Sequence, residues 1–172
     1  KDVPAGSDGV LFLPYLTGGT NDVKEATGCF LNMTLDTDQA TLWHAVLEAI
    51  GYDYMEITDL YRGAGVDMSR ITITEGGSRS EIWNQMKSDM LGSEVITLKN
   101  AGGAVVTDCI GGAYALGHIT DMKAALTESL EIKKLYYTNA ENHDFYAKQY
   151  ALQKKLVKQD MKEAFHTLKA LH

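Results

Sequence analysis

The chain has 172 residues, 45% hydrophobic and 23% charged, which is typical of one globular domain with a buried core. Its net charge of −7 argues against a nucleic-acid partner or an anionic membrane surface. No apolar run is long enough for a membrane span and no signal peptide opens the chain, so we expect a cytoplasmic protein.

The first third of the chain predicts two short strands followed by a long helix. We expect strands at residues 10–13 and 29–33, joined by a polar loop. The capping residues at 36–38 then begin a helical pattern that continues to about Arg62. Its apolar stripe is predicted from five side chains at near-helical spacing: Leu42, Val46, Ile50, Ile57 and Tyr61.

Residues 70–92 are the most informative segment, because they predict a strand, a glycine turn and a helix in direct succession. Ile71 and Ile73 alternate with threonines, as a strand requires. Gly76 and Gly77 then allow a tight turn and close approach of a ligand to the backbone. A helix that begins beside such a turn attracts anions. An ordinary strand-to-helix connection explains the same pattern equally well, so the residues alone leave both interpretations open.

The helix after this turn has recognisable ends. Ser78 or Ser80 can cap its start, and Gly92 is placed to end it. Trp83 stands where it could shield a planar ligand, although a tryptophan in an amphipathic helix is more often part of a core. Three side chains at fourfold spacing predict the buried face: Ile82, Met86 and Met90.

The remaining sequence continues the alternation of strands and helices, which indicates an α/β domain with a partly parallel sheet. We predict a strand at 95–98, helices at 101–117 and 121–130, an extended segment at 131–138, and a long helix at 141–171 broken at most once.

The helix at 101–117 is unusually rich in small residues. Gly103, Thr107, Gly111 and Ala115 recur every four positions and predict a smooth face for close packing, although a loop is the competing assignment. Asp108 in this helix is either a buried acid or, as we favour, a solvent-facing residue.

Motifs that would identify a catalyst are missing from the sequence. The five histidines have no ligand-like spacing, the two cysteines favour free thiols over one disulfide, and we expect no metal held by histidine or cysteine. The chain has no GxxxxGK[ST] loop, no GxGxxG motif and no G-x-S-x-G elbow. The residues therefore support a nucleotide or phosphate binder but name no catalytic group.

Five segments together carry a resemblance to a known family. They are GVLFLPYLTG at 9–18, GCFLNM at 28–33, TEGGSRS at 74–80, the small-residue helix at 102–115 and the tyrosine-containing stretch at 137–150. In this order they resemble the C-terminal lobe of the FGGY carbohydrate kinases, which include xylulokinase, gluconate kinase and glycerol kinase.

The resemblance implies an actin-like, ribonuclease-H-like fold with a mixed sheet flanked by helices and a long C-terminal helix. It implies ATP-dependent phosphorylation of a sugar or polyol hydroxyl, with ATP and Mg²⁺ as cofactors. Gly77 would let the adenosine lie on bare backbone and Gly76 would make the turn. Ser78 and Ser80 would offer polar contacts to the base or ribose.

Departures from the family pattern limit what the resemblance implies. Asn32 stands at an expected glycine, Glu75 stands where many members have glycine, and the loop at 18–22 is short. Nothing in residues 1–172 matches the family's phosphate loop, sugar-binding residues or catalytic aspartate. We therefore expect residues 1–172 to be the C-terminal nucleotide-binding lobe of a sugar kinase, inactive without an N-terminal lobe that binds most of the sugar.

One alternative is a stand-alone actin-like nucleotide-binding module with a regulatory or assembly role. The sequence also leaves open which sugar is phosphorylated and whether the chain forms a homodimer.

Overall fold

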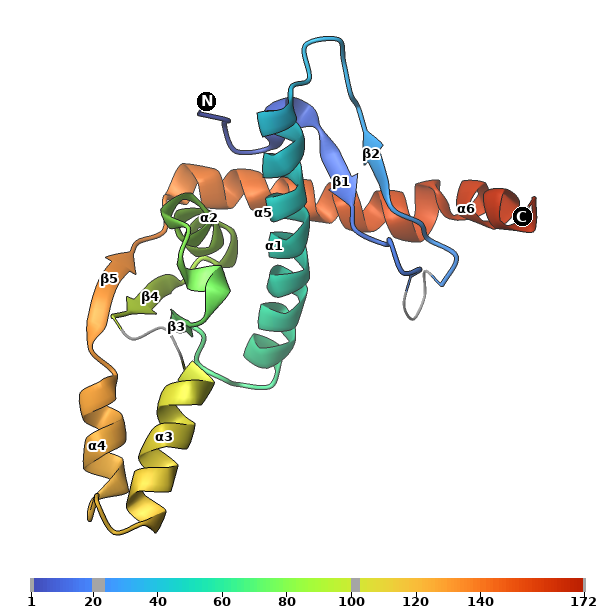
Figure 1. The fold of residues 1–172 in the computed structure, drawn as a ribbon. Coiled ribbons are helices and arrows are strands. Elements are labelled where there is room, and N and C mark those ends of the chain that lie inside the picture. Colours follow the sequence, from blue (N-terminus) through green and yellow to red (C-terminus); the bar gives the residue numbers. More distant parts are fainter. Residues whose placement is uncertain (1, 20–23, 100–102, 172) are drawn as a thin grey trace.

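The computed structural model describes residues 2–19, 24–99 and 103–171 (Figure 1). Its strands are β1 (Leu11–Leu13), β2 (Cys29–Leu31), β3 (Arg70–Ile73), β4 (Glu94–Leu98) and β5 (Ile132–Tyr136). Its helices are α1 (Gln39–Gly63), α2 (Glu81–Leu91), α3 (Gly103–Ala115), α4 (Met122–Ser129), α5 (Ala140–Lys155) and α6 (Lys162–Ala170). The predicted order of strands and helices is confirmed.

The strands form two separate small sheets. β1 and β2 pair antiparallel, with Phe12 opposite Phe30. In the second sheet β4 is central, parallel to β3 and antiparallel to β5, so the predicted partly parallel sheet is confirmed. Strands β3 and β4 flank the glycine turn and α2 in the chain, as a parallel strand–helix–strand crossover requires.

Helix α1 begins at the predicted cap, because Asp38 Oδ1 accepts a hydrogen bond of 2.9 Å from the backbone N–H of Thr41. The predicted stripe of this helix is only partly right: Leu42 and Val46 pack against a small core with β1, but Ile57 and Tyr61 are about half exposed. The buried face lies beside that stripe and consists of Thr41, Ala45, Glu48, Ala49, Gly51, Tyr52, Met55 and Thr58.

The largest core cluster joins α1, α2 and α5. Tyr52 of α1 stacks on Tyr150 of α5 with ring centroids 6.1 Å apart, and Met90 of α2 lies between these helices. Gly51 allows this approach, because a Cβ there would collide with the Met90 thioether. A glycine inside a helix ordinarily weakens it, but at this position it permits close packing.

A buried carboxylate ties three parts of the chain together. Glu48 of α1 is 1% exposed and accepts hydrogen bonds from the backbone N–H of Gly6 (2.6 Å), the hydroxyl of Ser7 (2.7 Å) and the hydroxyl of Tyr146 in α5 (3.0 Å). His44 lies against the same group, with Nδ1 at 2.9 Å from the Ser7 hydroxyl. Since each donor is satisfied, Glu48 fixes both the N-terminal turn and α5 to α1.

Helices α3 and α4 form a hairpin that extends away from the three-stranded sheet (Figure 1). No residue in either helix is buried, and Thr107 and Ala115 are exposed. The close-packed face predicted for the small-residue helix is therefore absent from residues 103–115, while the favoured solvent-facing position of Asp108 is confirmed.

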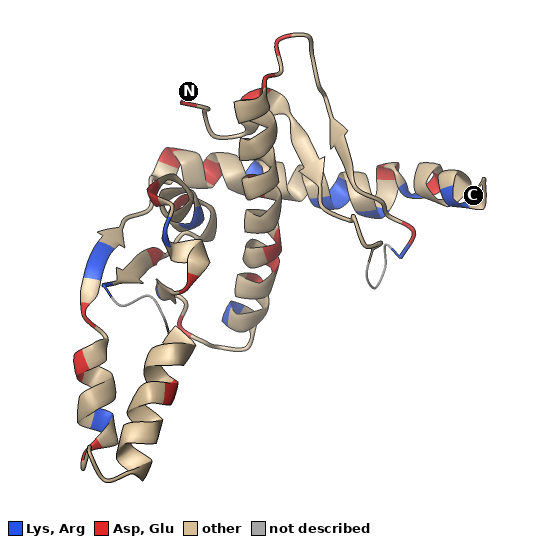
Figure 2. Cartoon of the chain, viewed as in Figure 1, with Lys and Arg blue, Asp and Glu red and all other residues tan. Residues whose placement is uncertain are grey.

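The C-terminal helix is broken once, as predicted. α5 passes through a π-helical turn at Leu156–Asp160 into α6, whose Phe165 is buried beside β1 residue Leu13. Acidic and basic residues are interspersed along the elements (Figure 2). Of the helices in the described ranges, none has both the length and the apolar character needed to cross a membrane.

Candidate nucleotide-binding turn

The candidate site lies where β3 ends and α2 begins. A single 3-10 turn, Gly76–Ser78, connects the strand to the helix, and the backbone N–H of Ser78 donates to Glu75 O at 3.1 Å. Ser80 is the cap of α2, because its Oγ accepts from the backbone N–H of Trp83 at 3.3 Å. Gly92 ends the helix in the left-handed conformation at φ +58°, as predicted.

Glu75, rather than either glycine, carries the unusual backbone of this turn. Its φ of 59° and ψ of −155° lie in a region occupied almost only by glycine, whereas Gly76 and Gly77 have ordinary negative φ. Its carboxylate accepts a hydrogen bond of 3.3 Å from the backbone N–H of Ala104 in the first turn of α3. Glu75 thus links the glycine turn to the start of the next helix.

The two glycines leave different amounts of space. A Cβ on Gly76 would meet nothing within 4 Å, so the backbone there is open to an approaching ligand. A Cβ on Gly77 would lie 3.6 Å from Trp83 and 3.7 Å from Lys87 Nζ, which is ordinary contact. Neither glycine is needed by the fold for steric reasons, which makes both positions suitable for substitution tests.

The two serines do not point to one common space. Ser78 is 8% exposed, and its hydroxyl donates to Glu75 O at 2.8 Å, closing the turn from inside. Ser80 is exposed and lines a separate hollow of about 250 Å³ with Trp43 and His44. The structure therefore assigns the Ser78 side chain to the turn and the Ser80 side chain to the helix cap.

A lysine that sequence analysis did not single out lies behind the turn. Lys87 of α2 is 2% exposed; its Nζ donates to Gly77 O at 2.7 Å and lies 3.7 Å from the ring centroid of Trp83. Burial lowers the pKa of the Lys87 ammonium to about 8, and no described carboxylate pairs with it. The sequence feature that could have identified Lys87 is its position between Met86 and Met90, on the buried side of an amphipathic helix.

Gly77 and Lys87 close one end of a cavity of about 410 Å³. Side chains from α1 and β3 make most of its wall, and they are chiefly apolar or aromatic: Tyr54, Ile57, Tyr61, Ile71 and Ile73. Gly76, Ser78 and Ser80 are outside this wall. The four candidate residues are therefore close along the chain without facing a single hollow.

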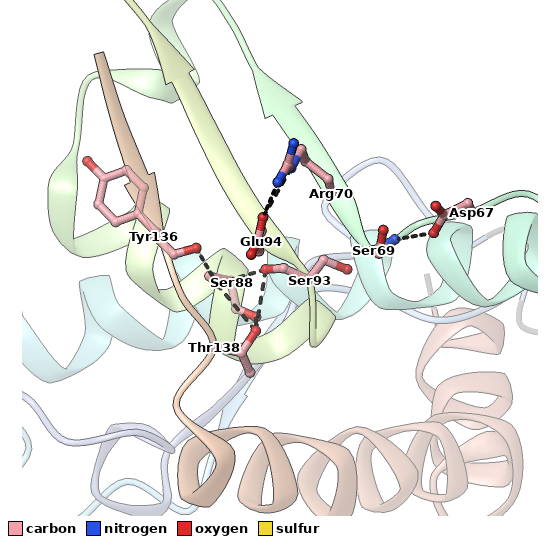
Figure 3. Close-up of polar contacts among 8 residues, drawn as sticks. All are labelled: Asp67, Ser69, Arg70, Ser88, Ser93, Glu94, Tyr136 and Thr138. Carbon is pink, nitrogen blue, oxygen red and sulfur yellow. Dashed lines mark hydrogen bonds and ion pairs between the residues drawn. The ribbon is translucent and has the colours of Figure 1, made fainter. Parts of the chain in front are cut away.

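The far end of α2 is held firmly against the sheet (Figure 3). The Ser88 hydroxyl donates to Ser93 O at 2.8 Å, and the Thr138 hydroxyl donates to Ser88 O at 3.0 Å. Across the β3–β4 pair, Arg70 and Glu94 form an ion pair of 2.9 Å. The Ser88 contacts hold the C-terminal end of α2, and the Arg70–Glu94 ion pair joins the two parallel strands that flank this helix in the chain.

In the described ranges, no group of three histidine, cysteine, aspartate or glutamate side chains could hold a metal ion. Cys29 and Cys109 are both free thiols, as favoured from the sequence.

Comparison with known proteins agrees with this architecture. The profile of the "FGGY family of carbohydrate kinases, C-terminal domain" matches residues 1–118. The xylulose kinase of Staphylococcus epidermidis is 30% identical over 156 residues, which are 90% of this chain and 32% of that protein. The gluconokinase of Bacillus subtilis is 34% identical over 128 residues, or 71% of this chain and 24% of that protein. The chain thus spans about a quarter to a third of the length of these relatives.

Solved structures share the fold. A gluconate kinase from Lactobacillus acidophilus superposes with a TM-score of 0.75 at 21% identity, over 96% of this chain and 34% of that one. A glycerol kinase from Plasmodium falciparum, solved with ADP, superposes with a TM-score of 0.72 at 15% identity. The match covers 88% of this chain and 31% of that one. The fold is the predicted actin-like one, with helices on a mixed sheet and a C-terminal helix. The chain therefore belongs to the FGGY family of carbohydrate kinases, and what it matches is their C-terminal domain.

Proposed function

We propose that residues 1–172 are the C-terminal, nucleotide-binding lobe of an ATP-dependent kinase that phosphorylates a sugar or polyol hydroxyl. Membership of the FGGY family supports the reaction class, and the names of the relatives, xylulose kinase and gluconokinase, support a carbohydrate acceptor. The observation that carries the nucleotide site is the open backbone at Gly76 and Gly77, between a parallel strand and a capped helix.

ATP fits the residues at this turn. The absence of side chains on Gly76 and Gly77 leaves the peptide backbone accessible to the adenosine, and the N-terminal end of α2 favours negatively charged groups nearby. Lys87 holds Gly77 O and so stabilises the turn from behind. We assign Ser78 and Ser80 to the same site as residues that shape it, because Ser78 closes the turn through its hydroxyl and backbone and Ser80 caps α2.

Mg²⁺ at nucleotide sites is usually held by one or two carboxylates together with phosphate oxygens and water. In the described part of the chain no three histidine, cysteine, aspartate or glutamate side chains lie together, so on this proposal the nucleotide and polypeptide beyond residues 1–172 would supply most of its ligands. In the proposed reaction, the sugar hydroxyl attacks the γ-phosphorus of ATP, the bond to the β-phosphate oxygen breaks, and ADP leaves. The base that accepts the hydroxyl proton belongs, on this proposal, to polypeptide beyond residues 1–172.

The test is an assay of two proteins with ATP and a panel of pentoses, polyols and sugar acids. We expect the complete product of the gene to phosphorylate at least one compound, and the 172-residue chain to phosphorylate none. Turnover of any sugar by the purified 172-residue chain would contradict the proposed division between the two lobes. Lack of turnover by the complete product across the panel would contradict the kinase assignment.

A further inference from the structure

Two backbone N–H groups of the glycine turn, those of Gly76 and Gly77, point out of the turn. The carbonyl of Glu75 accepts a hydrogen bond from the N–H of Ser78 at 3.1 Å, and the carbonyl of Gly76 accepts from the N–H of Arg79 at 3.3 Å. In a trans peptide the N–H lies opposite the C=O, and the N–H groups of Gly76 and Gly77 belong to these two peptides. They therefore face away from the inner bonds of the turn, and no described residue accepts from them.

Two side chains of α2 hold the next two carbonyls of the turn. Lys87 Nζ donates to Gly77 O at 2.7 Å, and Asn84 Nδ2 donates to Ser78 O at 2.7 Å. Asn84 is 0% exposed and Lys87 is 2% exposed, so water does not compete for either bond. The two side chains are three positions apart on the helix, and Lys87 Nζ lies 3.5 Å from Asn84 Oδ1. Consecutive carbonyls of the turn are thus both drawn towards α2.

The charge of Lys87 is not explained by the packing of the core. The residue lies between Met86 and Met90, where an apolar side chain would fill the space without the cost of burying an ammonium group. No described carboxylate pairs with it. A buried cation without a counterion, beside a candidate ligand site, is a functional candidate. An anion bound at the turn would compensate this charge.

We propose that Lys87 and Asn84 are positioning residues for the nucleotide. Each holds one carbonyl of the turn against α2, and together they keep the N–H groups of Gly76 and Gly77 directed at the ligand. Neither side chain touches the nucleotide on this proposal, since each acts through a backbone carbonyl. The inference rests on the proposed function, because it takes a nucleotide as the ligand of the turn.

Lys87 should also make nucleotide affinity depend on alkaline pH. Burial lowers the pKa of its ammonium to about 8. A bound anion favours the charged form, so binding above pH 8 takes up a proton and weakens as the pH rises, whereas affinity below pH 8 is constant. Tyr54 and Tyr61 of α1 are the titratable side chains that share its cavity. The carboxylate of the turn, Glu75, is instead bonded to the N–H of Ala104.

Calorimetric titration of the 172-residue chain with Mg-ADP at pH 7.5 and pH 9.5 tests the proposal. We expect the affinity of the unchanged chain to be lower on the order of tenfold at the higher pH. Lys87→Met cannot donate to Gly77 O; it should bind on the order of tenfold more weakly at pH 7.5 and show no further fall. Lys123→Met, at an exposed position of α4, is the matched control and should behave like the unchanged chain. Equal affinities of Lys87→Met and the unchanged chain at both pH values would overturn the proposal.

Asn84→Asp tests the second positioning residue. Aspartate is similar in size to asparagine, but its carboxylate cannot donate to Ser78 O, so we expect ADP binding to weaken several-fold. Unchanged affinity would overturn the role given to Asn84. The pH profile of the unchanged chain needs no variant, so a flat profile overturns the role of Lys87 even if a substitution prevents folding.

Kinetics of the complete gene product separate positioning from a merely structural role. Lys87→Met should raise KM for ATP about tenfold and change kcat and KM for the sugar less than about twofold. A loss in kcat alone would overturn the proposal, because it would indicate only a smaller folded fraction. Absence of sugar turnover by the unchanged complete product would contradict the kinase assignment, whereas the ADP titration still decides this inference. The two failures are therefore distinguishable.

Discussion

Four described residues other than glycine have a positive φ: Ser7, Asp8, Asn32 and Glu75. Asn32 and Glu75 are the two positions at which the resemblance to the FGGY pattern led us to expect glycine, in many members if not in all. Asn32 has φ +60°, which asparagine tolerates, and its side-chain amide donates to Gly9 O at 3.1 Å. Glu75 has φ 59° in a region that costs a residue with a Cβ about 1–3 kcal/mol. At both positions the chain thus has a positive φ without a glycine.

Glu75→Gly should therefore stabilise the chain. The substitution removes the backbone strain of the folded state. The greater conformational freedom of glycine in the unfolded chain opposes this gain by about 0.5–1 kcal/mol. We expect a net gain of about 1 kcal/mol in the free energy of urea unfolding. Glu75→Ala is the matched control, because it removes the carboxylate and its bond to Ala104 but keeps the strain. Alanine as stable as glycine at this position would contradict the strain argument.

Lys87 should make stability depend on alkaline pH. Burial lowers the pKa of its ammonium to about 8, from an ordinary value of 10.5, so the unfolded chain binds more protons between these pH values. Stability should therefore rise as the pH increases from about 8 to about 10.5. In urea unfolding, the stability of Lys87→Met should not rise between pH 8 and pH 10.5 in this way. The exposed Lys123→Met is the control and should keep it; an unchanged pH profile in Lys87→Met would contradict the assignment.

At the scale of elements, the contact of α1 with α2 depends on one glycine. Gly51→Ala places a methyl group against the thioether of Met90, which is 1% exposed and would have to shift. We expect a loss of about 1–3 kcal/mol in unfolding free energy despite the better helix propensity of alanine. Gly63→Ala, at the open end of the same helix, should be neutral or slightly stabilising. Equal effects at the two positions would show that packing against Met90 is unimportant.

The carboxylate of Glu48 joins α1, α5 and the N-terminal turn. Glu48→Ala leaves the N–H of Gly6 and the hydroxyls of Ser7 and Tyr146 without their acceptor, and each buried donor left unpaired costs about 1–3 kcal/mol. We expect thermal unfolding to show a loss of at least about 3 kcal/mol. Tyr146→Phe removes one bond only and should cost about 1 kcal/mol. A loss in Glu48→Ala no larger than that of Tyr146→Phe would contradict the network.

Element positions were predictable from sequence wherever local chemistry decides them. Asp38 and Ser80 cap their helices and Gly92 ends one, because each uses only atoms a few residues away. Burial was less predictable, since it depends on which elements meet. Ile82 continues the spacing of Met86 and Met90 yet is 69% exposed, whereas Asn84 in the same turn is fully buried.

At the candidate site, too, the local structure was predictable from sequence and the contacts between distant residues were not. The strand, the turn and the helix were predicted, but the unusual backbone conformation of Glu75 was not. Lys87 was missed because its partner, Gly77 O, is a backbone atom ten residues away that no sequence pattern marks.

At the scale of the molecule, the described residues form a lobe with two surfaces that no other described element covers. The α3–α4 hairpin has no buried residue, and the cavity between α1 and β3 is apolar and accessible. Both surfaces agree with a chain that spans about a third of its relatives, and the kinase proposal places the missing catalytic groups in the remainder.

The central claim is that the Gly76–Gly77 turn binds nucleotide. Its most direct test is a titration of the ¹⁵N-labelled 172-residue chain with millimolar Mg-ADP, followed by amide NMR. We predict saturating shift changes centred on Gly76, Gly77 and Ser78, lost in Gly77→Leu and kept in Gly63→Ala, where the added methyl group lies in open space at the end of α1. Changes confined to other segments, or none at saturating nucleotide, would contradict the claim.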